Sequence, residues 1–538
     1  MENQNIPNQP NTPMPNAPGQ SYNAAPAAPL DIPDLPTAQP LTKPKYSLTD
    51  SICAWVCLLL GFIFTRYVCG YAGGLWGGIF WAAVGALGAV YVRLKALKTT
   101  PVQIAVFIIA ELFCLTPIFC ANGFVNTLAA MFSFVLIFYL AVSISGAALF
   151  GKHFVLDALS GVFARPFMSF THSPRAALGL FRGGKDGKGS KTAVYILLGL
   201  LIAVPLTIVV FVLLVLSDSV FEGIMDNFFA SLANISFALF WQILFAIPVG
   251  MYLFGTLFSA ARPAWSYSDE PPVYRFLPAP VAYTAVTPIC VFYLIYIITQ
   301  LGYFTAAFGG ELPEGYNYSE FARRGFFELC IIAVINLCVI TLMQALVKRH
   351  EGDRRPKALR VYTVIISVFT LLLITSALSK MILYINELGM TQLRVYTSWF
   401  MILLAIIFVM IIVLQIKEFA FWKVLFAAFT VMMGVLCFGN IDGAIARYNV
   451  SAYQSGALED IDFQALYPLG AAAVKPVSEL LSDEDYRYHT EYFLGDVLDD
   501  LNEKDDFAYF SIQKVSAEKI CEREGIDPQE YAIELYRF

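Results

Sequence analysis

The sequence predicts an all-α fold: a polytopic bundle of about eleven transmembrane helices followed by a small helical domain. Of the 538 residues, 58% are hydrophobic and only 14% are charged, whereas charged residues make up about 25% of a typical soluble protein. The hydrophobic residues also form uninterrupted blocks of about 20 residues, the length that crosses a bilayer. A soluble multidomain enzyme is therefore excluded.

The elements follow in three regions. Residues 1–46 are rich in Pro, Asn and Gln and hold few large apolar side chains, which predicts a disordered tail. Residues 47–439 contain the expected spans, at 48–68, 72–92, 101–121, 124–149, 193–216, 233–258, 280–306, 326–347, 361–385, 395–416 and 419–438. Residues 440–538 carry helical patterns with 8 basic and 21 acidic side chains, which predicts a small acidic helical domain and argues against nucleic acid as a partner.

The distribution of basic residues predicts the orientation in the membrane. The tail and alternate connections hold 22 of the 35 Lys and Arg residues, and the opposite connections hold few. Cytoplasmic loops carry the excess of basic residues. We therefore expect a cytoplasmic N-terminus and, after eleven spans, an extracytoplasmic C-terminal domain.

The motifs of common cofactor and metal sites are missing from the sequence. Gly189 is followed by Ser190, where a phosphate-binding loop requires Lys, and the four histidines fall far apart along the chain. No pair of cysteines has the CxxC spacing of a metal or redox site. We therefore expect no cofactor and no metal, and the sequence favours a function that is not enzymatic.

Charged residues gather at the predicted outer ends of the last four spans. Charges in or beside a span are costly, so each is a candidate for function. The basic members also oppose the usual scarcity of cations on the outer side. We name this set the outer charged cluster, and its members are Glu320, Arg323, Arg324, Glu328, Lys380, Tyr384, Glu387, Arg394, Asp442 and Arg447.

The same segments resemble a known family. YSEFARRGFFEL, SALSKMILYINELGMTQLRVYTSWFM and NIDGAIARYN are similar to motifs of bacterial multi-pass membrane proteins of domain of unknown function 4173, a relative of 4153. Lys380 stands where those proteins would have Arg, which keeps the charge but loses the bidentate geometry. The resemblance implies a bacterial plasma-membrane protein and no particular activity.

Three functions remain open on the sequence alone. The first is an envelope binding or sensing protein, whose outer charged cluster binds an anionic lipid or envelope polymer and whose cytoplasmic parts meet a protein partner. The second is a secondary transporter that uses the intramembrane acid Glu111, with prolines in several spans. The third is a transferase for lipid-linked substrates, with Glu320 or Glu328 as base. Against them, the outer cluster could consist of helix-end ion pairs, and Glu111 could be a neutral acid hydrogen-bonded between helices.

Overall fold

The computed structural model is built of helices, and it confirms the predicted all-α membrane fold. Ten helices among the described residues are long and apolar enough to cross a membrane, and they coincide with ten of the eleven predicted spans. The predicted span 193–216 lies outside the described residues except for isolated helical positions, and so does the tail up to Lys45. The structure describes residues 46–70, 73–151, 154–181, 237–262, 275–309, 326–349, 356–503 and 506–526, with a few single positions between 199 and 210.

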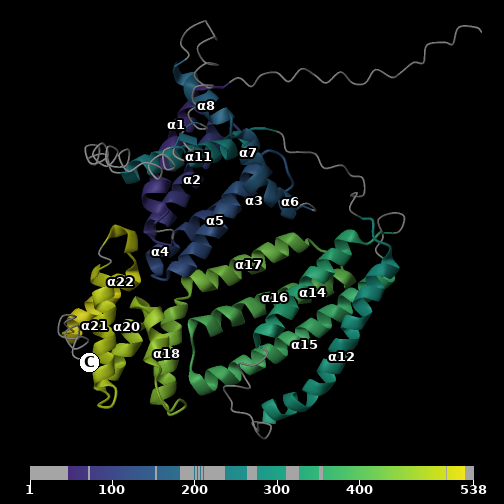
Figure 1. Cartoon of the computed structure of the whole chain (residues 1–538), viewed down its shortest axis with the longest axis vertical. Helices are drawn as coiled ribbons and strands as arrows, with labels where there is room; N and C mark the ends of the chain where they lie inside the picture. Colours follow the sequence, from purple (N-terminus) through teal and green to yellow (C-terminus); the bar gives the residue numbers. More distant parts are fainter. Residues whose placement is uncertain are drawn as a thin grey trace, which may run out of the picture. The chain divides into compact units, whose positions relative to one another are not determined.

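Five long helices share one hydrophobic core, and we call them the first membrane bundle. They are α1 (Leu48–Ile63), α2 (Leu75–Leu94), α3 (Pro101–Cys114), α5 (Gly123–Ile144) and α11 (Phe237–Ala260) (Figure 1). Side-chain caps begin three of them: Ser47 on α1, Thr100 on α3 and Asn122 on α5. A cap satisfies amide groups that a helix start leaves without partners, which is most needed where water is scarce.

Glycines allow α1 and α11 to pack at close range. A Cβ on Gly61 would lie 2.2 Å from the Ala246 carbonyl oxygen, and one on Gly250 would lie 2.7 Å from the Leu58 Cα. Small residues at such crossings let membrane helices approach backbone to backbone. The pairing therefore depends on these two positions.

Short helices cover one end of the first membrane bundle. They run from Phe154 to Phe181 as α6 (Phe154–Leu159), a π-helical turn, α7 (Arg165–Ser169), α8 (His172–Ala177) and a final 3-10 turn. They pack on α1, α5 and α11. Trp55 of α1 donates to the Ala177 carbonyl oxygen at 3.1 Å, and Tyr46 bonds to His172 at 2.7 Å. This end of the bundle therefore carries Tyr46, the first residue described.

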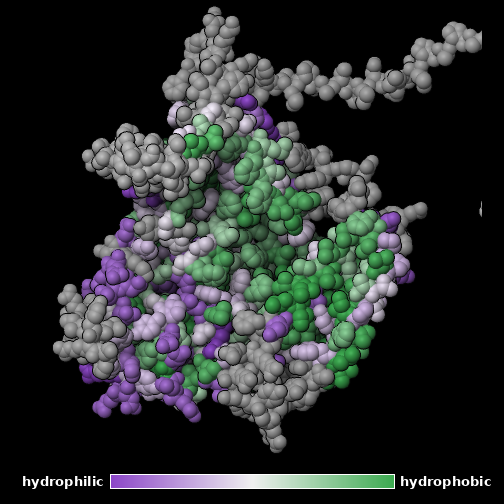
Figure 2. Space-filling view, viewed as in Figure 1, coloured by the Kyte–Doolittle hydropathy of each residue, from purple (hydrophilic) through white to green (hydrophobic). Residues whose placement is uncertain are grey.

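The second membrane bundle has its own core and consists of α12 (Ala279–Gly309), α14 (Phe326–Leu346), α15 (Lys357–Leu388) and α16 (Gln392–Ile416). Helix α17 (Phe421–Phe438) packs on α5, where Phe132 contacts both Phe426 and Phe429. At the end of α17, Phe438 contacts Phe113 of α3. Figure 2 shows hydrophobic residues gathered over α12, α14 and α15. These exposed apolar surfaces suit a lipid environment.

The C-terminal helices enclose a third core, and we call them the C-terminal helical domain. They are α18 (Ile441–Gln454), α19 (Phe463–Leu466), α20 (Ala471–Val477), α21 (Arg487–Glu503) and α22 (Ile512–Glu524), with short 3-10 turns between them. Their outer surface is hydrophilic, in contrast to the membrane helices (Figure 2). The predicted helical character of this region is therefore confirmed.

Candidate functional site

The outer charged cluster lies only partly in the described residues. Glu320, Arg323 and Arg324 fall outside them. Glu328 is exposed in the first turn of α14, and the half-buried Lys380 of α15 lies within electrostatic range of it. The part of the outer charged cluster formed by Glu320, Arg323 and Arg324 therefore stays a prediction.

Arg394 caps the C-terminal end of α15. Its guanidinium donates to the carbonyl oxygens of Leu388, at 3.0 Å, and of Gly389. The same guanidinium lies over the Tyr384 ring, 4.0 Å from the ring centroid, in a cation–π arrangement. Two members of the outer charged cluster, Tyr384 and Arg394, thus hold the α15–α16 turn in place. Gly389 itself adopts a φ of +73°, a conformation that favours glycine.

Asp442 lies at a junction of three parts of the molecule. This residue of α18 is 5% exposed, and its carboxylate accepts hydrogen bonds from the Asn122 amide at 2.7 Å and the Gln392 amide at 2.9 Å. Asn122 caps α5 and also donates to the Tyr396 hydroxyl of α16 at 2.8 Å. We call these four side chains the Asp442 junction. Burial raises the pKa of Asp442, although the hydrogen bonds from Asn122 and Gln392 oppose the effect.

A neighbouring set of contacts extends the Asp442 junction. The Gln513 side chain of α22 accepts from the Ala121 amide at 2.7 Å and donates to the Asn440 side chain at 2.7 Å. Asn440 caps α18 in a left-handed conformation, with a φ of +47°. The C-terminal helical domain is thereby bound to the connection between α4 (Thr116–Phe119) and α5 at two places.

The remaining predicted members are exposed. Glu387 lies on the last turn of α15, and Arg447 lies on α18, outside the Asp442 junction. The neutral amides of Asn122, Gln392 and Gln513 were not predicted. The high cost that marks a charged residue beside a span does not mark a neutral amide. The signal that could have found Asn122 is its position directly before a predicted span, where Asn is a favoured helix cap.

Glu111 lies inside the first membrane bundle on α3. Its Oε1 atom is buried and has no hydrogen-bond partner in the described part of the chain. The carboxyl group fills the space beside Gly85 of α2, where a Cβ would lie 1.9 Å from Oε1. Four residues later α3 stops at Leu115, and Pro117 follows in α4, as expected for a proline that removes a helical hydrogen bond.

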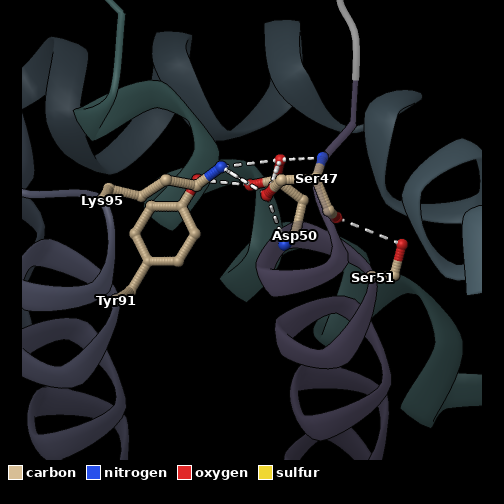
Figure 3. Close-up of polar contacts among 5 residues, drawn as sticks. All are labelled: Ser47, Asp50, Ser51, Tyr91 and Lys95. Atoms are coloured by element: carbon tan, nitrogen blue, oxygen red, sulfur yellow. Dashed lines mark hydrogen bonds and ion pairs between the residues drawn. The ribbon is translucent and has the colours of Figure 1, made fainter.

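A second charged group, shown in Figure 3, lies at the start of α1 and the end of α2. Asp50 of α1 is 1% exposed, and Lys95 contacts its carboxylate at 2.7 Å. The buried Tyr91 hydroxyl donates to the same carboxylate at 2.9 Å. Lys95 also donates to Ser47 at 2.8 Å, and Ser47 and Asp50 together cap α1. Lys95 is one of the basic residues whose distribution predicted the topology, and Asp50 was not predicted as a site residue. A carboxylate in the first turn of a span was nevertheless a visible signal.

Residues 107–480 match the family described as domain of unknown function DUF4153. The chain belongs to this family. DUF4153 is the relative that was named beside 4173 in the sequence analysis, and membership of 4173 itself stays a prediction. No curated protein and no solved structure matches the chain.

The DUF4153 match includes Glu111, Lys380, Arg394 and the whole Asp442 junction. It begins within α3, so the Asp50–Lys95 pair of α1 and α2 precedes it. It ends in the turn after α20, before α21 and α22. The DUF4153 region therefore comprises part of the first membrane bundle, all of the second and the first half of the C-terminal helical domain.

Proposed function

We propose that this DUF4153 protein is a non-enzymatic binding and sensing protein of a bacterial plasma membrane. Its C-terminal helical domain lies outside the cell, binds an anionic lipid or envelope polymer, and transmits the bound state to the membrane helices. A protein partner in the cytoplasm receives the signal. The observation that carries the proposal is the buried Asp442, because one carboxylate joins α18 to the starts of α5 and α16.

Such a junction suits signalling for a physical reason. A buried carboxylate must keep its hydrogen-bond partners, since leaving one unsatisfied costs about 1–3 kcal/mol. A shift of α18 relative to α5 therefore cannot proceed by small steps and instead exchanges one set of partners for another. Arg447, exposed one and a half turns further along α18, gives an anionic ligand a contact on the same helix.

The positions of charges support the orientation. Asn122 at the N-terminal end of α5 contacts the C-terminal helical domain. At the other end of α5, Ser143 accepts a hydrogen bond from Gln103, close in sequence to Arg93, Lys95 and Lys98. Basic residues mark the cytoplasmic side, so the domain belongs outside. Reporter fusions after Arg93 and after Phe538 test this orientation, and cytoplasmic signal from Phe538 would contradict it.

The binding step is tested with two soluble polymers. Hydrogen exchange of the full chain in detergent is measured alone, with poly(glycerol phosphate) and with neutral dextran. We expect poly(glycerol phosphate) to slow exchange in α18 and at the start of α16, and dextran to leave both unchanged. The Arg447→Gln variant should lose the response, while Arg523→Gln on the exposed end of α22 should keep it. An unchanged exchange pattern in the wild type would contradict the proposal.

The second candidate is a secondary transporter, and the unbonded Glu111 Oε1 atom favours it. A buried carboxyl oxygen without a hydrogen-bond partner inside the membrane is a candidate proton carrier. Labelling with a hydrophobic carbodiimide, which reacts with protonated carboxyls, tests this. Glu111 should be labelled faster as the pH falls, with Glu387 as the exposed control. A labelling rate of Glu111 that does not depend on pH would contradict proton coupling.

A further inference from the structure

A cavity of about 580 Å³ lies within the first membrane bundle. Its walls come from α1, α2, α3, α5 and α11, and two glycines of α2, Gly85 and Gly88, help to form it. A side chain on Gly88 would point toward Leu257 of α11, whose Cδ2 lies 3.6 Å from the position of a Cβ. The volume falls within the range of about 300–1,000 Å³ that is typical of sites for small molecules.

The polar groups inside the cavity are already bonded to the protein. Gln103 donates to Ser143 at 2.8 Å, Tyr91 donates to Asp50 at 2.9 Å, and Thr256 donates to the Tyr252 carbonyl oxygen at 3.1 Å. The remaining deep wall is apolar, with Phe107, Ile137 and Phe138 among its members. A polar ligand would lose its hydrogen bonds to water without replacement there, so the interior suits a hydrocarbon chain.

The mouth of the cavity combines lipid-facing and basic side chains. Ala89 and Ile104 are exposed on the membrane surfaces of α2 and α3, while Arg93 and Thr99 are exposed at the ends of the same helices. No carboxylate pairs with Arg93 in the part of the chain that the structure describes. A bilayer lipid would meet the mouth with its chain at the level of Ile104 and its headgroup at the level of Arg93.

We propose that this cavity binds one acyl chain of an anionic phospholipid from the adjacent leaflet, with the headgroup phosphate at Arg93. The apolar deep wall offers a charged headgroup no polar contact. The chain therefore enters first and the phosphate stays at the mouth. This inference concerns the end of the bundle opposite the Asp442 junction and does not depend on the proposed function.

The test compares lipid retention in native mass spectrometry. The full chain is exchanged into nanodiscs of equal phosphatidylglycerol and phosphatidylcholine, released, and the bound lipids are counted. We expect the wild type to retain phosphatidylglycerol in preference to phosphatidylcholine. Gly88→Leu, which fills the cavity, should lose both lipids. Arg93→Gln should lower phosphatidylglycerol retention about fivefold and leave phosphatidylcholine retention nearly unchanged.

Matched controls separate the site from general effects. Gly434→Leu places the same side chain on α17, where nothing lies within 4 Å of a Cβ. Arg360→Gln removes an exposed cation near the start of α15. Both controls should retain lipid like the wild type. The inference is overturned if Gly88→Leu retains lipid like Gly434→Leu, if Arg93→Gln behaves like Arg360→Gln, or if the wild type shows no preference for phosphatidylglycerol.

Discussion

Asn122 donates its side-chain amide to the Asp442 carboxylate at 2.7 Å, across 320 residues of sequence. The same Asn122 accepts the amides of Phe124 and Val125 through its Oδ1 atom, at 2.9 and 3.2 Å, and so caps α5. One side chain therefore begins a membrane helix and also binds the C-terminal helical domain. A change in the position of α18 must alter the hydrogen bonding at the start of α5.

The first prediction concerns Asp442→Asn. The variant keeps the size of the side chain, but an NH2 group replaces one of the two oxygens to which Asn122 and Gln392 donate, so a donor faces a donor at that position. We expect a loss of about 1–3 kcal/mol in the stability of the docked domain. Hydrogen exchange should become faster in α18 and at the start of α5. The second membrane bundle away from α16 should be unaffected.

The matched control for that change is Asp462→Asn. Asp462 is an exposed acid of the same domain that caps the short helix α19 through the Ala465 amide. Its replacement should leave exchange in α5 unchanged. Equal effects of the two variants on α5 would mean that the Asp442 junction does not couple the domain to the membrane.

The fold was largely predictable from the sequence, and the site was not. Blocks of apolar residues long enough to span a bilayer leave few alternatives to a helix, because every backbone polar group must bond within its own segment. Ten spans were therefore found, most of their ends within a few residues, for example Pro101–Phe119 for 101–121. The ends differ more at Leu239–Ala260, predicted as 233–258, and at Ala279–Ile298, predicted as 280–306. Arg66 lies near the end of the first span, which was predicted to run to residue 68. There the helix continues as a π-helical turn to Val68.

A contact between two side chains that lie some 300 residues apart leaves no pattern in a single sequence, unlike the apolar blocks that mark the spans. Arg394 was predicted as a member of the outer charged cluster, and in the structure it donates to the carbonyl oxygens at the end of α15. Asp442 was grouped with cations, and its partners proved to be neutral amides. Charge singled out Arg394 and Asp442 in the sequence, but the choice between ion pair, cap and junction depended on which helices become neighbours.

The second prediction concerns Lys95→Ala. Lys95 is the cation that contacts the Asp50 carboxylate, and the Asp50 side chain is only 2% exposed. Removing one partner of a buried pair leaves an uncompensated charge, which costs about 3 kcal/mol. We expect a clear fall in the melting temperature in detergent. Lys98→Ala, at an exposed position three residues later, should have little effect.

A second substitution identifies the cause of the Lys95 effect. Asp50→Asn removes the charge that Lys95→Ala leaves unpaired, so the double variant should be more stable than Lys95→Ala alone. If the double variant is less stable than either single variant, the lysine contributes through packing along Tyr91 and not through its charge.

The third prediction tests the close approach of Gly85 and Glu111. In Gly85→Ala the new Cβ would lie 1.9 Å from Glu111 Oε1, so the carboxyl must move out of its place. We expect a loss of about 1–3 kcal/mol in stability, as for other overpacked cores. Gly88→Ala should be nearly neutral, because its Cβ meets Leu257 at an ordinary 3.6 Å. In a Glu111→Ala background, Gly85→Ala should lose most of its effect. If Gly85→Ala lowers stability as much in the Glu111→Ala background as in the wild type, then Phe107, and not Glu111, limits the space beside Gly85.

The last prediction is a dependence of stability on acid through His172. Burial, together with the nearby Arg262 and Arg175, lowers the pKa of His172 from 6.5 to about 4. The Nδ1 atom of the His172 ring forms a hydrogen bond of 2.7 Å with the Tyr46 hydroxyl, and the ring packs against the Phe258 ring. Between pH 6.5 and 4 the unfolded chain binds a proton at this residue and the folded chain does not. The free energy of unfolding should therefore fall as the pH is lowered through this range.

His172→Gln should reduce this acid sensitivity, because glutamine does not titrate, while it retains a group that can bond to Tyr46. The measurement is the melting temperature of the wild type and the variant in detergent from pH 7.5 to 4.5. His489→Gln, at an exposed histidine of α21, is the control and should keep the wild-type slope. The difference between wild type and His172→Gln should be largest at the acid end, where the unfolded wild type gains most from protonation. Parallel curves would mean that His172 is protonated in the folded chain and that Tyr46, Phe258 and the two arginines do not exclude its charge.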